Sequence, residues 1–329
     1  MKKSLFILGM LCAAVTTIGL PAKAAQPEPK FPEKPVKLIV PFVPGGFTDS
    51  MARLTAEQMS SVLGQSVIVE NKPGANGIIA AEYVSRAPAD GYTLMVASAE
   101  TLAINPNVYK DLRYKADKDF APVGSIVSVP LFVTVNSETG DPSLAEFVAR
   151  AKKNPKQLSY ASWGTGSTGH FAVELFNSKA GTEMTHIPYK GTGPGLVDVM
   201  GGRVDMILTT LMTSEQFARD GKVRLLAITS PQRSPKMPEV PTASELGIEN
   251  YDVALWYGIV APAGTPEPVI ARLNAALREG TANPKFKASM DASDAVILVR
   301  SPAEFGSFLE AERQKWGTVA KSSNIVLQQ

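Results

Sequence analysis

The chain has 329 residues, of which 44% are hydrophobic and 19% charged, with a formal net charge of +2 at pH 7. This length suggests two domains, and the nearly balanced charge argues against nucleic acid as a partner. Cys12 is the only cysteine, so an internal disulfide and a zinc–thiolate cluster are excluded.

The first residues have the pattern of a secretory signal peptide. Two lysines follow the first methionine, an apolar run covers residues 4–20, and residues 22–24 read Ala-Lys-Ala, a small-residue cleavage site. A membrane anchor is disfavoured because the run is shorter than the about 20 residues of a membrane span. We therefore predict a signal peptide over residues 1–24, a periplasmic location, and a mature chain of 30 basic and 31 acidic residues without cysteine.

After this segment, a strand, a glycine turn and a helix recur along the chain. Apolar, β-branched runs at residues 36–42, 66–71 and 92–98 predict buried strands. Helical periodicity at residues 51–64 and 78–91 follows the first two strands. This alternation predicts a parallel sheet with helices on both faces.

The same pattern starts again after residue 135. Helices are predicted over residues 143–154, 170–181 and 196–202, and strands over residues 158–162, 184–189, 204–210 and 223–230. A further strand is predicted within residues 251–266, followed by helices over residues 266–280 and 302–323.

We therefore expect two α/β lobes joined by two crossings, near residues 125–131 and 254–259. Lobe 1 would comprise residues 25–126 and 255–329, and lobe 2 would comprise residues 127–254. Ligands of open α/β sheets bind outside the carboxyl ends of the strands. The glycine turns of both lobes are therefore expected to face one cleft.

One of these turns has the outline of a dinucleotide site. Gly164, Gly166 and Gly169 follow the order G-x-G-x-x-G between a predicted strand and a predicted helix. A dinucleotide site also needs an acidic residue after the next strand, where this chain has Lys190. The free N–H groups and positive end of a helix suit a carboxylate equally well, so a carboxylate site is favoured over a dehydrogenase.

A second turn has the same character. Gly45, Gly46 and Thr48 open the helix after the first strand, and the other turn adds hydroxyls from Thr165, Ser167 and Thr168. Asp49 has two open interpretations, capping this helix or contacting the ligand. Two opposed helix ends could hold two carboxylates without a buried arginine, so dicarboxylates, amino acids and aromatic acids are candidate ligands.

Catalytic motifs are missing from the sequence. There is no G-x-S-x-G elbow, no H-E-x-x-H and no phosphate-binding loop of the G-x-x-x-x-G-K type. His170 and His186 are the only histidines, and a structural role is the favoured interpretation of both because no catalytic partners accompany them. We therefore expect that the protein is not an enzyme and that it binds no cofactor and no metal.

Six stretches of the chain share a family resemblance. They are KLIVPFVPGGFTDSMARL, VIVENKPGANGIIAAEYVSRAPADGYTL, YASWGTGSTGH, HIPYKGTGPGLVDVMGGRVD, LLAITSPQRSPKMPEVPTASELG and GIVAPAGTPEPV. The chain resembles the extracytoplasmic solute receptors of tripartite tricarboxylate transport systems, the Bug or TctC-like family. The resemblance implies a two-lobed periplasmic binding protein of type II, with two doubly wound sheets joined by a two-strand hinge and closing like a Venus flytrap.

The resemblance also assigns ligand contacts to turns of both lobes. These residues are Gly45, Gly46, Phe47, Thr48, Asp49, Ser98, Trp163, Gly164, Thr165, Gly166, Ser167, Thr168, Tyr189, Lys190 and Thr192. Two interpretations of Phe47 and Trp163 remain open: packing between lobes, which is favoured, or two rings that enclose a flat acid, with Trp256 and Tyr257 as further candidates.

The implied function is reversible capture of a small carboxylate by a monomer, which delivers it to integral membrane permease subunits. Two alternatives remain at this point. The chain could present its ligand to a signalling partner as a sensor, or it could be a secreted hydrolase or lyase built on the same lobes.

Overall fold

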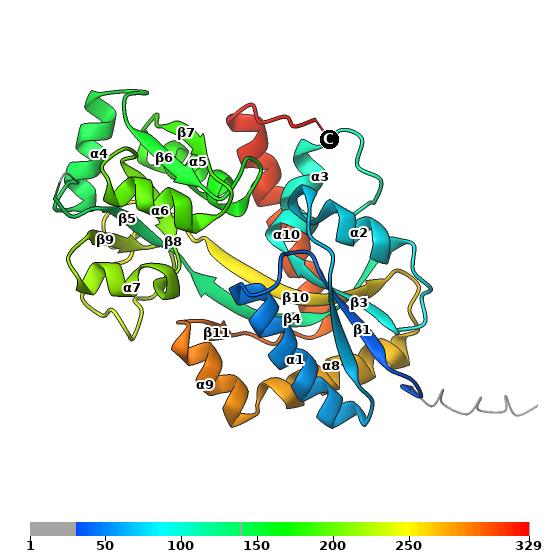
Figure 1. The fold of residues 1–329 in the computed structure, drawn as a ribbon. Coiled ribbons are helices and arrows are strands. Elements are labelled where there is room, and N and C mark those ends of the chain that lie inside the picture. The colour runs from blue at the N-terminus through cyan, green and yellow to red at the C-terminus, as the bar shows by residue number, and fades with distance from the viewer. Residues whose placement is uncertain (1–30, 139, 329) are drawn as a thin grey trace, which may run out of the picture. The chain divides into compact units, whose positions relative to one another are not determined.

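The computed structural model describes residues 31–138 and 140–328, so the predicted signal peptide lies outside the described residues. Two mixed sheets organise this part of the chain (Figure 1). In sheet order, the first contains β11 (Val296–Ile297), β4 (Phe120–Pro130), β10 (Ala254–Pro262), β3 (Thr93–Ser98), β1 (Val36–Val40) and β2 (Val67–Asn71). The second contains β7 (Thr185–Pro188), β6 (Ser159–Ser162), β8 (Met206–Thr209), β5 (Phe132–Asn136) and β9 (Val223–Ile228).

The two-lobed α/β architecture is confirmed, and the first three predicted strands are parallel as expected, but each sheet also contains antiparallel strands that the sequence did not reveal. β1 runs parallel to β2 and β3, whereas β10 runs antiparallel to β3 and β4. In the second sheet, β6 runs parallel to β7 and β8, whereas β5 runs antiparallel to β8 and β9. Hydrophobic patterns report burial and not strand direction, so they could not reveal the reversed strands.

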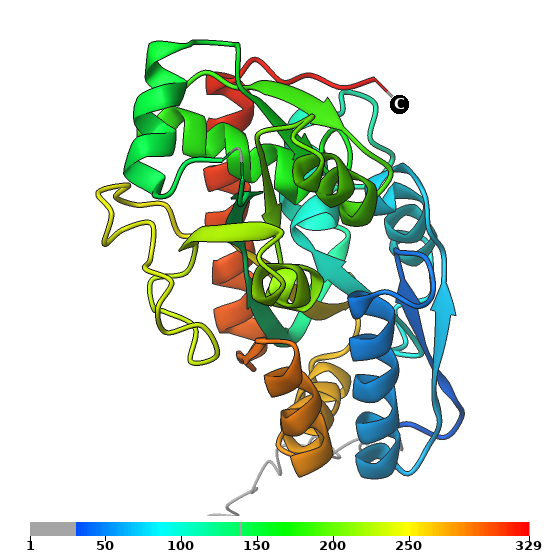
Figure 2. The same cartoon turned by 60° about the vertical axis from the view of Figure 1, so that its left-hand side comes forward.

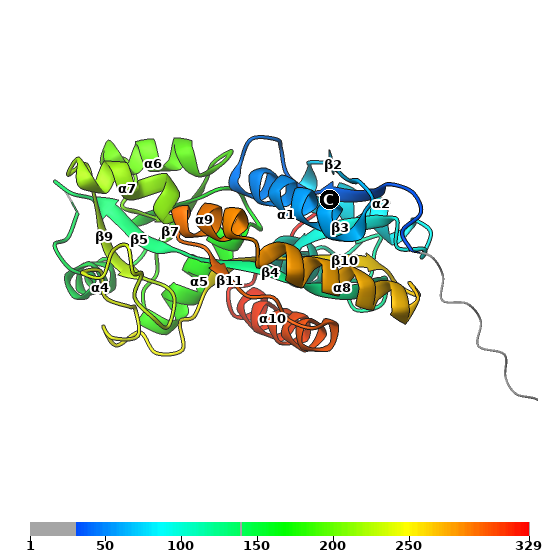
Figure 3. The same cartoon turned by 90° about the horizontal axis from the view of Figure 1, so that it is seen from below.

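The chain passes between the two sheets twice, and each passage adjoins one of two neighbouring strands of the first sheet, β4 or β10. β4 ends at Pro130 and continues through Leu131 into β5, and the chain returns from β9 through residues 229–253 into β10 (Figure 3). β4 and β10 pair along most of their length. β4 therefore stays in the first sheet beyond residue 126, where the boundary of lobe 1 was expected.

Helices follow most of the parallel strands. Those near the first sheet are α1 (Phe47–Leu63), α2 (Ile78–Ser85), α3 (Asn105–Val108), α8 (Glu267–Thr281), α9 (Pro284–Ala292) and α10 (Pro302–Ser322). Those of the second sheet are α4 (Leu144–Lys153), α5 (Thr168–Ala180), α6 (Thr192–Met200) and α7 (Leu211–Arg219). A 3-10 turn, η1 (Ala75–Gly77), and a π-helical turn, η2 (Glu100–Ile104), complete the set. The sequence did not predict α3, α7, α9 or η2.

Strand alternation divides the core of the first sheet into two faces. Val36, Leu38 and Val40 of β1 pack in a cluster with α1 and α8, whereas Ile39 belongs to the cluster on the opposite face. Successive side chains of a strand point to opposite faces, so β1 is buried on both sides in its carboxyl-terminal half, whereas Lys37 near its start is exposed. This double burial holds the carboxyl end of β1, and the turn after it, in a fixed place.

The last long helix connects the two sheets. α10 packs against β4 and η2 of the first sheet and against α5 of the second, as Figure 2 shows. The rings of Trp316 in α10 and Phe171 in α5 lie 6.1 Å apart, edge to face, and both are fully buried. One continuous hydrophobic cluster therefore contains residues of both sheets.

Candidate functional site

The turn after β1 is braced by Asp49. Its Oδ2 accepts hydrogen bonds from the Gly45 N–H (3.1 Å) and from Arg53 Nε (2.9 Å), and its Oδ1 accepts one from Asn71 Nδ2 (2.8 Å). The bond to Arg53, supported by those to Asn71 and Gly45, lowers the pKa of Asp49 to about 2 against the opposing effect of burial. The carboxylate therefore uses its acceptors on the chain itself and braces the turn, but it does not cap α1, because none of these three donors is a free N–H group of the helix.

The N-terminus of α1 has no side-chain cap. Gly46 is the N-cap, with φ −83° and ψ 177°, and no side chain of the described residues accepts a hydrogen bond there. A Cβ atom at Gly46 would meet nothing within 4 Å. The first N–H groups of a helix have no partner inside the helix, so this end is a candidate anion site.

Aromatic residues lie beside this helix end. The rings of Phe47 and Tyr257 are 5.8 Å apart, and Tyr257 is buried. Burial raises the pKa of Tyr257, a hydrogen bond with the buried Thr48 opposes the rise, and the charge of Glu100 adds to it. Thr48 therefore lies next to the Tyr257 hydroxyl, and the charge of Glu100 is near enough to affect it.

Many hydrogen-bonding groups of the turn after β6 are paired within the turn itself and with the first residues of α5. Ser167, the N-cap of α5, donates to the Gly164 carbonyl (2.6 Å) and accepts from the His170 N–H (3.3 Å). The Gly166 N–H donates to His170 Nδ1 (3.2 Å). Gly164 and Gly166 have φ of +140° and +79°, conformations that favour glycine. The three glycines thus build a tight turn, and part of its donor set is already used.

Both histidines lie under this turn. Their rings stack 3.9 Å apart, and Ser162 Oγ lies 2.7 Å from His186 Nε2. Burial lowers the pKa of His170 to about 4, and burial together with the charge of His170 lowers the pKa of His186 to about 4. Ser162 is fully buried and also donates to the Gly164 carbonyl (3.0 Å). This pairing supports a structural role for the histidines.

A carboxylate of the first sheet meets the start of α5. Glu100 follows β3, and its Oε1 accepts from the Thr168 N–H (3.0 Å) and from Thr168 Oγ1 (2.7 Å). Nearby, Asn76 Nδ2 donates to the Thr165 carbonyl (3.0 Å). The turns at the carboxyl ends of β2 and β3 thus touch the turn at the carboxyl end of β6, as expected for two lobes that share a site.

The remaining predicted residues lie at the end of β3 in the first sheet or after β7 in the second. Ser98 Oγ is sealed from solvent without a hydrogen-bond partner, and Ser98 pairs with Tyr257 in the strand register. After β7, the Tyr189 hydroxyl donates to Asp198 (2.6 Å), while Lys190 is exposed. Thr192 is the first residue of α6, which, like α1, has no side-chain cap.

The two predicted rings pack in different clusters. Trp163 packs against the cluster that contains α5, and its ring atoms lie so close to Gly169 that a Cβ there would meet them at 2.5 Å. Phe47 packs against the cluster that contains α1. Each ring therefore has ordinary packing partners.

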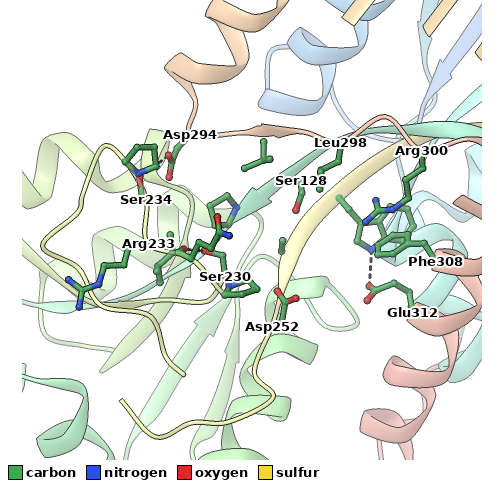
Figure 4. Close-up of a pocket in the computed structure, with 18 of the residues that line it drawn as sticks. Ser128, Ser230, Arg233, Ser234, Asp252, Asp294, Leu298, Arg300, Phe308 and Glu312 are labelled. Carbon is green, nitrogen blue, oxygen red and sulfur yellow. Dashed lines mark hydrogen bonds between the residues drawn. The ribbon is translucent and has the colours of Figure 1, made fainter. Parts of the chain in front are cut away.

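A cavity of about 520 Å³ lies on the other face of β10. Trp256 lines it, and its indole donates to Glu312 of α10 (2.8 Å); Arg300, Phe308, Asp252 and Ser128 also line it (Figure 4). Neighbouring residues of a strand point to opposite faces, so Trp256 faces away from the side on which Tyr257 meets Phe47. The proposal that Trp256 joins the ring pair is therefore not supported.

Sequence reasoning missed Glu100 and Asn76, whereas Tyr257 was named only as a further candidate beside Phe47 and Trp163. Glu100 and Asn76 each follow the carboxyl end of a predicted strand, which is the position that the general rule for α/β sheets selects. Attention to every residue after such a strand would have included them. Within residues 31–138 and 140–328, no group of three or more His, Asp or Glu side chains could hold a metal ion. The same residues contain no helix long and apolar enough to span a membrane.

Known proteins share this fold and sequence. BugT of Bordetella pertussis is 33% identical over 99% of both chains. The R. palustris protein Rpa4515, solved with adipate, is 35% identical, with a TM-score of 0.80 over 91% of this chain and all of the other. MatC from Rhodopseudomonas palustris, solved with bound malate, is 33% identical, with a TM-score of 0.77 over 88% of this chain and 99% of the other.

The match to a family covers most of the chain. Residues 51–325 match the family described as the tripartite tricarboxylate transporter family receptor. The predicted family resemblance is thereby confirmed, and the chain belongs to this family of solute-binding receptors.

Proposed function

We propose that this chain captures a small organic acid in the periplasm and delivers it to integral membrane permease subunits. Dicarboxylates and aromatic carboxylates are the candidate ligand classes. The protein acts as a monomer, makes no covalent bond to the ligand and performs no chemical step on it.

The meeting of the carboxyl-end turns carries this proposal. Glu100 and Asn76 of the first sheet bond to Thr168 and Thr165 of the second, so turns of both sheets surround one region. The ends of α1 and α6 have no side-chain caps, and each offers N–H donors and a partial positive charge. A carboxylate is the ordinary ligand for such donors.

The connections between the sheets support closure about a hinge. Within the described residues, two chain passages join the sheets, at Leu131 and before Ala254, and the strands β4 and β10 next to them lie side by side. Rotation of one lobe relative to the other about these two passages would open the side of the protein on which α1 and α6 begin. The relatives solved with adipate and malate bind carboxylates on the same fold, which supports a carboxylate here.

The experiment is a thermal-shift and calorimetric screen of the mature protein with dicarboxylates, aromatic acids and amino acids. A ligand at 100 times its dissociation constant stabilises the protein by about 2.7 kcal/mol. Gly46→Val places a side chain over the start of α1 without backbone strain, because φ is −83° and the space is open. We expect this variant to fold and to lose binding.

Gly201→Val is the matched control. Gly201 is exposed, has a negative φ and lies at the C-terminal end of α6, away from the helix starts. It should bind as the wild type does. Undiminished binding by Gly46→Val would refute a site at the start of α1.

A further inference from the structure

The anion position at the start of α5 already holds a carboxylate of the protein. Glu100 Oε1 accepts from both the N–H and the hydroxyl of Thr168, which is the first residue of α5. Glu100 is only 6% exposed, and no Lys, Arg or His in the described residues forms an ion pair with it. The end of α5, a helix of 13 residues, is therefore the main favourable partner of this charge.

The second oxygen of Glu100 stays available. Oε2 has no hydrogen-bond partner in the described residues, and it is not among their sealed, unpartnered polar atoms. It therefore borders accessible space. The charge of Glu100 acts on Tyr257, whose ring contacts Phe47 at the start of α1. Glu100 follows β3 of the first sheet and bonds to Thr168 at the start of α5 beside the second sheet, so it lies in the region between the two sheets.

The three helix N-termini of the site therefore differ in whether they are free to bind an anion. α1 and α6 begin without side-chain caps, whereas the start of α5 is filled by Glu100 and by the Ser167 cap. A ligand carboxylate is attracted to the open ends and repelled by Glu100. A like charge next to a buried carboxylate disfavours binding, whereas a hydrogen-bond donor or a cation is favoured there.

We propose that Glu100 is a specificity-determining residue, which makes the receptor select acids that have one carboxylate at the open helix ends and an amino group near Glu100. This inference rests on the proposed function and specifies its small organic acid as an amino acid, in place of a dicarboxylate or an aromatic carboxylate.

The test uses acids that differ only at the distal end. Calorimetry measures hexanoate, ω-aminohexanoate and adipate, and the shorter set of butanoate, γ-aminobutanoate and succinate, on the mature wild type, Glu100→Gln and Glu249→Gln. Glu100→Gln keeps an oxygen that accepts from Thr168 and removes the charge. Glu249 is exposed, so Glu249→Gln makes the same change in net charge away from the region between the sheets.

We expect the wild type to bind the amino acid at least about tenfold more tightly than the dicarboxylate in the set that fits, a difference of about 1.4 kcal/mol. Glu100→Gln should reduce this ratio at least about tenfold, and Glu249→Gln should leave it unchanged. A wild type that binds the dicarboxylate as tightly as the amino acid overturns the inference, and this result decides the question even if Glu100→Gln does not fold.

An unchanged ratio in a folded Glu100→Gln protein also overturns it. If Gly46→Val loses binding but Glu100→Gln binds every acid as the wild type does, the proposed function is retained and only the role of Glu100 is refuted. If no acid of either set and no aromatic acid binds, the proposed function fails, and this inference fails with it.

Discussion

Replacing Asp49 by asparagine tests how the first turn is held. The change removes the charge that meets Arg53 and weakens the acceptor of the Gly45 N–H. The pKa of Asp49 falls from 3.8 to about 2 in the folded protein. A shift of one unit corresponds to 1.36 kcal/mol, so the ionised carboxylate contributes about 2 kcal/mol to the free energy of unfolding.

The pH dependence has a definite sign. The folded pKa lies below the unfolded one, so this contribution is complete above about pH 5 and is lost as the pH falls. By the same relation, about half of it remains near pH 3 and little near pH 2. At pH 7, Asp49→Asn should lower the free energy of unfolding by about 2 kcal/mol, which for a chain of about 300 residues corresponds to about 3 °C in Tm.

Urea unfolding of the wild type, Asp49→Asn and the exposed control Asp111→Asn at pH 7 and near pH 3 measures these quantities. The difference between wild type and Asp49→Asn should shrink by about half near pH 3, whereas the control should match the wild type at both pH values. A difference below about 0.5 kcal/mol at pH 7, or one that is equal at both pH values, would refute the reasoning.

Two further predictions concern buried polar groups. The pKa values of His170 and His186 fall from 6.5 to about 4 in the folded protein. The free energy of unfolding is therefore highest above pH 6.5, where both histidines are neutral, and it decreases as the pH falls toward 4. Between pH 7 and pH 5 the wild type should lose about 2 kcal/mol for each histidine, and the double variant to glutamine should lose less; parallel profiles would contradict this. Glu312 Oε2 accepts from the indoles of Trp256 (2.8 Å) and Trp316 (2.9 Å). Glu312→Leu leaves two buried donors unpaired and should cost about 2–4 kcal/mol in urea unfolding followed by tryptophan fluorescence, whereas the exposed control Glu310→Leu should cost little; equal stability of the two variants would count against the double acceptor.

Much of the fold could be predicted because buried strands and amphipathic helices leave periodic patterns. β1, β3 and α5 all lie where their patterns place them. α7 and α9 were missed because both are short, nine residues each, and few of their positions are buried. The direction of β10 was also inaccessible, because a strand that is buried on both faces reads the same in either sense.

The site was only partly predictable for a related reason. The glycines of the turns are visible because positive φ angles restrict the residue type. The partner of Thr168, Glu100, lies 68 residues away in the chain, and only the approach of the two sheets brings them together. Local sequence therefore identified a helix end that suits an anion, but it could not tell that a side chain already occupies that position.

The placement of β10 has a consequence for how the chain is made. This strand lies between β3 and β4 in the first sheet, yet it begins only at Ala254, after the whole second sheet has been synthesised. Until then, β3 and β4 have no common neighbour, and the first sheet stays divided. A nascent chain that lacks its last quarter therefore has no complete first sheet, so the folded state is reached only near the end of synthesis.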